Sequence, residues 1–444
     1  MRFQIVSLGC PKNDVDSEMM GEILRRAGHV PASSARKADV LIVNTCAFVR
    51  DAREESYASL RKLAAGKRRG QYLVAAGCLA QRYAEEIYGQ VPGVDAVLGT
   101  RSWPQIGELL RSLQEDCRPA LVLRSDQLVT SIPRRPASGS TAYLKIADGC
   151  SASCAFCAIP LIKGPQRSKP QTDILREARE LVGRRVREII LIGQNSTAYG
   201  RDLGQRDALP GLLDLICQHV PDLDWLRILY AYPQDVSPRL IETMARLPQV
   251  CHYLDLPLQH AHPDVLRRMS RPSDVAAVRR LLGDLRAAMP DIALRTTFIV
   301  GYPGETDEEF AALLSFMDEE RFDKVGVFAY SREEGTRAAE MPNQVAADVV
   351  AERFERAMLL QQGISLQRNE EQVGRTLRVL LEGAGDGLSV GRSYRDAPEI
   401  DGLVLIPEER KAGGYVQARV TSAQEYDLVA EIVHGHDGEA PPAA

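Results

Sequence analysis

Short apolar runs alternate with amphipathic helical stretches over two separate blocks of this chain. The runs are apolar on both faces, as strands are when helices cover both sides of a parallel sheet. The first block therefore predicts an N-terminal doubly wound parallel-sheet domain, residues 1–131. Its expected strands are 3–8, 39–44, 72–76 and 96–98, with helices near 16–27, 52–63 and 81–88.

A stretch rich in proline, serine and glycine, residues 132–141, follows the first block and is typical of a linker. The alternation then resumes over residues 142–371. Six parallel βα units predict a partial (βα)6 barrel, which places an active site at the carboxyl ends of its strands. The expected strands are 143–147, 188–192, 226–231, 253–256, 294–300 and 324–330.

The alternation of strands and helices ends with a long helical segment, residues 346–371. Short strand-like runs separated by glycine-rich turns predict a small C-terminal β-barrel over residues 372–435. Such barrels often bind nucleic acid, and a protein partner is the alternative. Residues 436–444 are expected to be disordered, and the whole chain is an α/β multidomain protein. The barrel's expected strands are 377–381, 403–406, 415–420 and 428–432.

The composition narrows the class of protein without deciding its chemistry. The 55 Lys and Arg against 60 Asp and Glu give a net charge of −5, so no overall polycation argues for a nucleic-acid binder. Nine cysteines in 444 residues are too sparse for a secreted disulfide scaffold. No apolar run approaches the ~20 residues of a membrane span. We expect a cytoplasmic protein with no membrane partner.

Cys150, Cys154 and Cys157 form a Cys-x-x-x-Cys-x-x-Cys motif directly after the first strand of the second block. Thiolates are the usual ligands of iron–sulfur clusters, and a cubane cluster has four irons. Three thiolates would leave one iron open to an amine and a carboxylate. A structural zinc knuckle and a redox pair are the alternatives, but zinc needs a fourth ligand and a redox pair does not need Cys150.

The motif's spacing, with Phe156 before its last cysteine, resembles the signature of the radical-SAM superfamily. That resemblance implies a [4Fe–4S] cluster and S-adenosylmethionine (SAM), whose one-electron reduction yields a carbon radical. Glycines and polar residues past the barrel strands can approach the nucleoside of SAM, and two arginines can bind the carboxylate of its methionine part. A turn before a helix explains Gly301 equally well. The candidate cofactor-binding residues are Phe156, Gly193, Gln194, Asn195, Arg227, Arg295 and Gly301.

Each of the first three predicted strands ends in a cysteine, namely Cys10, Cys46 and Cys78. In a doubly wound sheet the carboxyl ends of the strands share one edge, so these thiols should converge there. Gly9 and Gly77 would allow tight backbone turns beside them. One interpretation is a second iron–sulfur cluster; an equally open one is three small buried apolar side chains.

The whole chain except about its last ten residues resembles the methylthiotransferases, which are radical-SAM enzymes with an N-terminal cluster domain, a central barrel and a C-terminal TRAM domain. Its motifs are similar to those of the RimO branch. The branch that modifies transfer RNA usually has Gln-Met-Asn after the first cysteine, where this chain has Pro-Lys-Asn. The motifs are SLGCPKN (7–13), VDSE (15–18), YAYP (230–233), VFAYSREEGT (327–336) and APEIDG (397–402).

The resemblance implies an enzyme that attaches a methylthio group to the β-carbon of an aspartate in protein twelve of the small ribosomal subunit. It implies two [4Fe–4S] clusters, one on each set of three cysteines, and SAM as both methyl donor and radical source. An external electron donor and a sulfur source are implied as partners, and no residue beyond the cluster ligands is nominated as catalytic. The alternatives are the same reaction on a transfer-RNA adenosine, and an RNA- or ribosome-binding protein whose clusters are structural.

Overall fold

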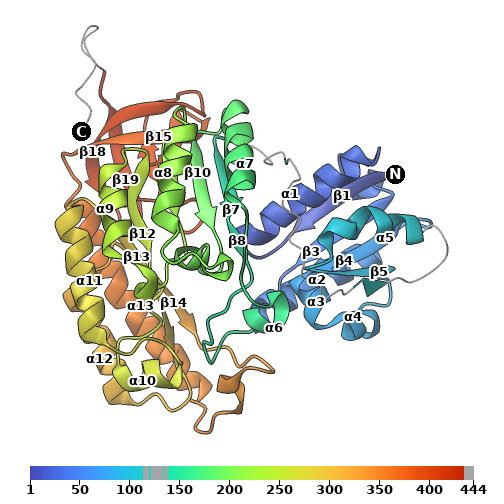
Figure 1. Ribbon diagram of the computed structural model, residues 1–444, viewed down its shortest axis with the longest axis horizontal. Coiled ribbons are helices and arrows are strands. Elements are labelled where there is room, and N and C mark those ends of the chain that lie inside the picture. The colour runs from blue at the N-terminus through green and yellow to red at the C-terminus, as the bar shows by residue number, and fades with distance from the viewer. Residues whose placement is uncertain (114–119, 122–133, 135–138, 435–444) are drawn as a thin grey trace.

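The computed structural model describes residues 1–113, 120–121, 134 and 139–434. Most of the predicted linker and the predicted disordered tail lie outside these residues, and the first barrel strand begins inside the predicted linker, at Thr141. Figure 1 shows three units in chain order: an α/β unit in blue, a barrel in green to orange, and a β-barrel in red. No helix in the described ranges is both long and apolar enough to cross a membrane.

The N-terminal unit is a six-stranded sheet of order β2-β1-β3-β4-β5-β6, and all its strand pairs are parallel. This confirms the doubly wound sheet. The two-residue strands β2 and β6 were not expected, because two residues give no periodic signal. The strands are β1 (Arg2–Ser7), β2 (Val30–Pro31), β3 (Val40–Thr45), β4 (Tyr72–Gly77), β5 (Ala96–Gly99) and β6 (Ala120–Leu121).

Helices cover both faces of this sheet (Figure 1). The first helix begins at Pro11, directly after Cys10, although the sequence predicted a start near residue 16. Proline suits this position because the first helical N–H has no intrahelical acceptor. The helices are α1 (Pro11–Arg26), α2 (Arg50–Ala65), α3 (Cys78–Arg82), α4 (Ala84–Gln90) and α5 (Ile106–Leu113).

The central unit is a six-stranded parallel sheet of order β14-β13-β12-β11-β10-β7, which confirms the partial (βα)6 barrel. Its outward-facing strand residues pack against the surrounding helices in one core. The strands are β7 (Thr141–Lys145), β10 (Glu188–Ile192), β11 (Trp225–Ile228), β12 (Val250–Asp255), β13 (Ala293–Val300) and β14 (Lys324–Ala329). The helices are α6 (Ile159–Lys163), α7 (Gln171–Gly183), α8 (Leu209–His219), α9 (Pro238–Arg246), α10 (Pro263–Arg268), α11 (Val275–Ala288), α12 (Asp307–Glu320) and α13 (Ala347–Glu370).

The helix α1 of the N-terminal unit lies against the open side of this barrel. It contacts β7, and Figure 1 shows the two side by side. Val15 and Met19 of α1 share one buried core with Ile190 and Tyr253 of the barrel interior. The N-terminal sheet is therefore held with the carboxyl ends of its strands close to the barrel.

The C-terminal unit is a closed five-stranded barrel of order β15-β16-β17-β19-β18, which confirms the predicted small β-barrel, although only four of its strands were expected. The strand β16 was missed, because Ser389, Gly391 and Arg392 interrupt its apolar character. The strands are β15 (Thr376–Gly385), β16 (Leu388–Arg392), β17 (Val404–Ile406), β18 (Tyr415–Ala423) and β19 (Leu428–Ile432).

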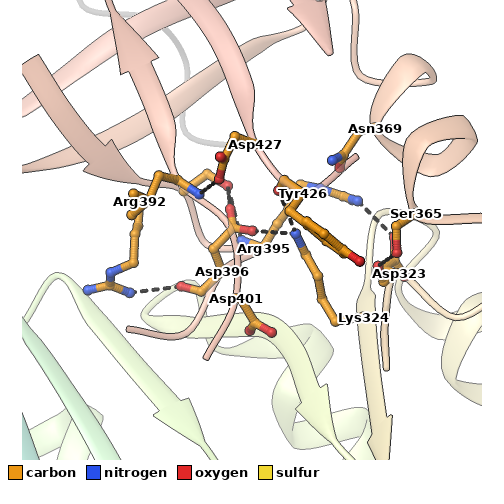
Figure 2. Close-up of polar contacts among 12 residues, drawn as sticks. Asp323, Lys324, Ser365, Asn369, Arg392, Arg395, Asp396, Asp401, Tyr426 and Asp427 are labelled. Carbon is orange, nitrogen blue, oxygen red and sulfur yellow. Dashed lines mark hydrogen bonds and ion pairs between the residues drawn. The ribbon is translucent and has the colours of Figure 1, made fainter. Parts of the chain in front are cut away.

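Buried ion pairs fix this β-barrel to the amino ends of the central strands (Figure 2). Arg395 lies 2.7 Å from Asp323, and the Lys324 ammonium lies 2.9 Å from Asp396. All four side chains are less than a tenth exposed. The C-terminal barrel therefore closes the end of the (βα)6 barrel opposite to its expected active site. The exact domain limits stay a prediction.

Candidate functional site

Cys10, Cys46 and Cys78 follow the neighbouring strands β1, β3 and β4 and meet at one edge of the sheet. A Cβ built on Gly9 would lie 2.9 Å from the Cys46 sulfur, so the chain at Cys10 touches Cys46. Burial raises the pKa of Cys78 to about 12, and the neighbouring Cys46 and Cys10 thiols contribute to the rise. The three side chains form one cluster, called here the sheet triad.

Two glycines make this convergence possible. Gly9 and Gly77 have φ of +95° and +93°, in the left-handed region that side chains disfavour. A Cβ on Gly77 would lie 2.4 Å from the Asn44 side-chain oxygen and 2.5 Å from the Thr45 carbonyl oxygen. The strands therefore turn sharply into Cys10 and Cys78, as the sequence predicted.

Asn13 holds the first turn of α1 to the strand ends. Its amide nitrogen donates to the carbonyl oxygens of Leu8, at 2.8 Å, and Thr45, at 3.1 Å. Its side-chain oxygen lies 3.9 Å from the Cys78 sulfur, within the range of a weak S–H hydrogen bond. We did not predict a role for Asn13 individually; the only signal was its place three residues after Cys10.

Cys150, Cys154 and Cys157 lie in the loop between β8 (Ala147–Asp148) and α6 and form a second cluster, the barrel triad. Burial raises the pKa of Cys157 to about 12, and the Cys154 and Cys150 thiols add to the rise. The Arg271 guanidinium lies 3.8 Å from the Cys154 sulfur and 4.1 Å from the centre of the Tyr232 ring. A cation therefore stands beside this triad.

The spacing of the thiols can be compared with that of a tetrahedral zinc site. In tetrahedral zinc sites, Zn–S bonds of about 2.3 Å place sulfurs roughly 3.8 Å apart. In the described part of the chain, the one group of three candidate ligands with all donor atoms within 4.8 Å of one another is His262, Asp264 and Glu309. The sulfurs of neither triad all lie within that distance of one another. In the His262 group the ring nitrogen already accepts from the Asp264 backbone, and Glu309 pairs with Arg268.

Four charged residues, three of them buried and Asp148 partly exposed, connect the two triads. The Lys163 ammonium of α6 lies 3.3 Å from Asp16 of α1 and 3.2 Å from Asp148, which precedes the barrel triad. Lys145 pairs with the same two carboxylates. Burial acts to lower the pKa of Lys163, but Asp148 and Asp16, together with the Cys78 and Cys10 thiols, raise it well above its usual value. Lys163 therefore lies beside the sheet triad while belonging to the helix that follows the barrel triad.

Most of the predicted cofactor residues lie past the carboxyl ends of the barrel strands. Gln194 donates to Asp148 at 3.4 Å, and its buried side-chain oxygen has no partner within the described residues. Asn195 caps the 3-10 helix Ser196–Ala198, and Phe156 packs edge-on against Tyr302 with ring centres 6.5 Å apart. Gly193 adjoins Gln194 directly after β10.

Gly301 has a structural reason to be glycine. Its φ is +73°, and a Cβ there would lie 2.3 Å from a methyl carbon of Val350 in α13. The turn into the following loop and the close approach of α13 explain the residue without a bound ligand, which was the alternative interpretation of the sequence.

Arg227 and Arg295 are not free to bind a cofactor carboxylate, so this expectation is corrected. Arg227 is fully buried and lies 2.7 Å from Glu188. Arg295 lies 2.9 Å from Asp255 and 3.4 Å from Asp401 of the C-terminal unit. Both side chains point into the barrel interior, where carboxylates already balance their charge. Arg271, which the sequence did not indicate, is the arginine beside the barrel triad.

Three family models match the chain, each on one structural unit. The uncharacterized protein family UPF0004 matches residues 2–99, the radical SAM superfamily matches residues 144–317, and the TRAM domain matches residues 373–433. The first covers the sheet triad and the second covers the barrel triad. Fold and site thus define a multidomain radical-SAM enzyme.

Curated relatives match over the full length. The ribosomal protein uS12 methylthiotransferase RimO of Roseiflexus sp. (strain RS-1) is 51% identical, over 99% of both chains. That of Chloroflexus aurantiacus is 52% identical, over 98% of this chain and 100% of its own. This chain belongs to the RimO family of methylthiotransferases.

Solved structures share the fold. The radical SAM methyltransferase TsrM from Kitasatospora setae has a TM-score of 0.58 at 13% identity, over 90% of this chain and 82% of its own. The cobalamin-dependent SAM radical enzyme OxsB has a TM-score of 0.52 at 9% identity, over 81% of this chain and 56% of its own. Both support the arrangement of an α/β unit beside a radical-SAM barrel.

Proposed function

We propose that this enzyme attaches a methylthio group to the β-carbon of an aspartate in ribosomal protein uS12, the substrate that its relatives' names give. The observation that supports the proposal is the pair of thiol triads joined by ion pairs. Each triad belongs to a different unit. Lys163 contacts Asp16 of the N-terminal unit and Asp148 of the barrel, and it lies near the sheet-triad thiols. Two metal groups bound there would share one space.

The cofactors that we infer are two [4Fe–4S] clusters and SAM. The donor sets fit, since each triad offers three thiols and leaves one iron of a cubane open. With cofactors bound, the barrel triad would support one-electron cleavage of SAM, and the sheet triad would support sulfur delivery, with a second SAM as methyl donor.

The chain's own residues orient these groups. An unactivated C–H bond has no acidic proton, so no general base is required and none is nominated. Gly9 and Gly77 set the directions of the sheet-triad thiols, and Asn13 ties α1 to them. The ion pairs of Asp16 and Asp148 with Lys145 and Lys163 hold the two triads next to each other.

The further partners that we propose follow from this reaction. An external electron donor must reduce the barrel-triad cluster, and a sulfur source must replace the sulfur that is transferred. A ribosomal substrate places the activity in the cytoplasm. The C-terminal β-barrel, which lies away from the triads, is the unit that we expect to contact ribosomal RNA or protein.

Anaerobic reconstitution with iron, sulfide, SAM and reductant tests the proposal with two single-cysteine variants. Cys154→Ala should release no 5′-deoxyadenosine. Cys46→Ala should still release it but should leave uS12 unmodified, as judged by mass spectrometry of the substrate. Methylthiolated uS12 from Cys46→Ala would show that the sheet triad is not the sulfur site. A product on transfer RNA instead of uS12 would favour the other branch.

A further inference from the structure

Lys12 is a buried cation next to the sheet triad. It lies two residues after Cys10 in the first turn of α1, and only 8% of it is exposed. Its ammonium lies 3.3 Å from the centre of the Tyr230 ring. In the described part of the chain no carboxylate forms an ion pair with it. An aromatic face attracts an ammonium but accepts none of its three N–H groups as well as a carboxylate would.

The other cations near the triads are already engaged. Lys145 and Lys163 share Asp16 and Asp148, so two positive charges meet two negative ones. Arg271 donates to the Pro257 carbonyl oxygen and stacks on Tyr232 beside the barrel triad. Within the described residues, Lys12 and Arg271 are therefore the cations in this region that no carboxylate pairs with; Arg271 lies beside the barrel triad, and Lys12 lies in the helix that follows Cys10.

The aromatic ring that the Lys12 ammonium contacts, that of Tyr230, lies at the carboxyl ends of the barrel strands. Tyr230 follows β11 by two residues, at the carboxyl end of that strand. Its φ is +63°, and its backbone N–H donates to Asp255 at 3.1 Å. A tyrosine in this conformation is disfavoured and persists only where its surroundings hold it, which is typical of functional sites. Lys12 thus lies where the N-terminal unit meets the carboxyl ends of the barrel strands.

The geometry of an aspartate side chain determines where a cation that binds it must lie. In an aspartate side chain the carboxylate is bonded directly to the β-carbon. A cation that binds that carboxylate must therefore lie within a few ångströms of the carbon that receives sulfur, and so beside the sheet triad. Lys12 stands two residues after Cys10, in the first turn of α1, with its ammonium over the Tyr230 ring at the carboxyl ends of the barrel strands.

We propose that Lys12 binds the carboxylate of the substrate aspartate and makes the enzyme select aspartate over asparagine. This inference rests on the proposed function. A buried ammonium–carboxylate contact is a charge-assisted hydrogen bond, and leaving a buried charge unpaired is costly. An asparagine at the same position would leave the Lys12 charge without an anion.

The test compares the binding of purified uS12 with that of uS12 carrying asparagine at the modified position. It uses the reconstituted enzyme with SAM but no reductant, so that no turnover occurs. Wild-type enzyme should bind the aspartate form at least about tenfold more tightly. Lys12→Met should bind both forms alike, and Lys12→Arg should restore the preference. Lys62→Met, on an exposed part of α2, should behave as wild type.

The outcomes distinguish a failure of the role of Lys12 from a failure of the proposed function. Wild-type enzyme that forms no methylthiolated uS12 under reducing conditions would contradict the function itself. Productive wild-type enzyme together with a Lys12→Met variant that keeps the aspartate preference would overturn the role of Lys12 alone. If Lys12→Met fails to fold or to bind iron, Lys12→Gln, which keeps a hydrogen-bond donor, gives the same comparison of preference. Retained preference in that variant would equally overturn the inference.

Discussion

The Lys163 ammonium lies 3.3 Å from the Asp16 carboxylate, and this buried ion pair joins the helix after the barrel triad to the helix after Cys10. Both side chains are 3% exposed. The pair therefore connects the two triads through the protein interior, and its integrity determines how they face each other.

Asp16→Asn should destabilise the protein by about 3–5 kcal/mol, because it leaves Lys145 and Lys163 with one carboxylate between them. We also expect more 5′-deoxyadenosine per methylthiolated product, because the ion pairs no longer hold the two triads in a fixed position relative to each other. Chemical denaturation and product ratios measure the two effects. Asp39→Asn, which removes an exposed pair with Arg2, is the control and should change neither. Unchanged stability in Asp16→Asn would contradict the importance of the network.

Gly77→Ala should prevent iron from binding at the sheet triad. The new Cβ would meet the Asn44 side chain and the Thr45 backbone at 2.4–2.8 Å, in a conformation that alanine disfavours. The iron content after reconstitution should fall to about half that of the wild type, which has two [4Fe–4S] sites under the proposal. Gly89→Ala in α4 is the matched control, because nothing lies within 4 Å of its Cβ. Full iron content in Gly77→Ala would show that the turn tolerates a side chain.

Arg392→Met should loosen the C-terminal barrel. The Arg392 guanidinium lies 2.6 Å from both Glu188 and Glu382, and the substitution leaves Glu188 buried with Arg227 alone. Removing one partner of a buried pair costs about 3–5 kcal/mol. Limited proteolysis should release the C-terminal unit sooner than in the wild type. In Arg410→Met, which removes a half-exposed pair with Glu408, cleavage should be unchanged.

His260 should make the protein less stable as the pH falls. Burial lowers the pKa of His260 to about 3, against about 6.5 in the unfolded chain. Between these values the unfolded state binds more protons, so the free energy of unfolding decreases by up to about 1.4 kcal/mol per pH unit on acidification. His260→Asn keeps an acceptor for the His262 N–H and should flatten the profile from pH 6 to pH 4. An equally steep profile in the variant would place the titration elsewhere.

The sequence predicted the architecture well because the strands of both sheets are apolar and regularly spaced. The strand 188–192 agrees to the residue, and the three N-terminal cysteines meet because parallel strands end at one edge. Edge strands of two residues and the polar strand β16 give no such signal.

Side-chain partners across the units could not be predicted in the same way. Arg227 and Arg295 belong to barrel strands as expected, but their carboxylates come from residues distant in sequence, Glu188, Asp255 and Asp401. The pairing of Lys163 with Asp16 spans 147 positions of the chain and depends on how the N-terminal unit packs on the barrel. Periodicity carries no information about such contacts.

Iron analysis and Mössbauer spectroscopy of a variant with Cys150, Cys154 and Cys157 all replaced by alanine decide whether the chain has two cluster sites. The sheet triad is intact in this variant, so it should retain half of the wild-type iron as one [4Fe–4S] cluster. Loss of all iron, or zinc bound in its place, would contradict a second cluster on Cys10, Cys46 and Cys78.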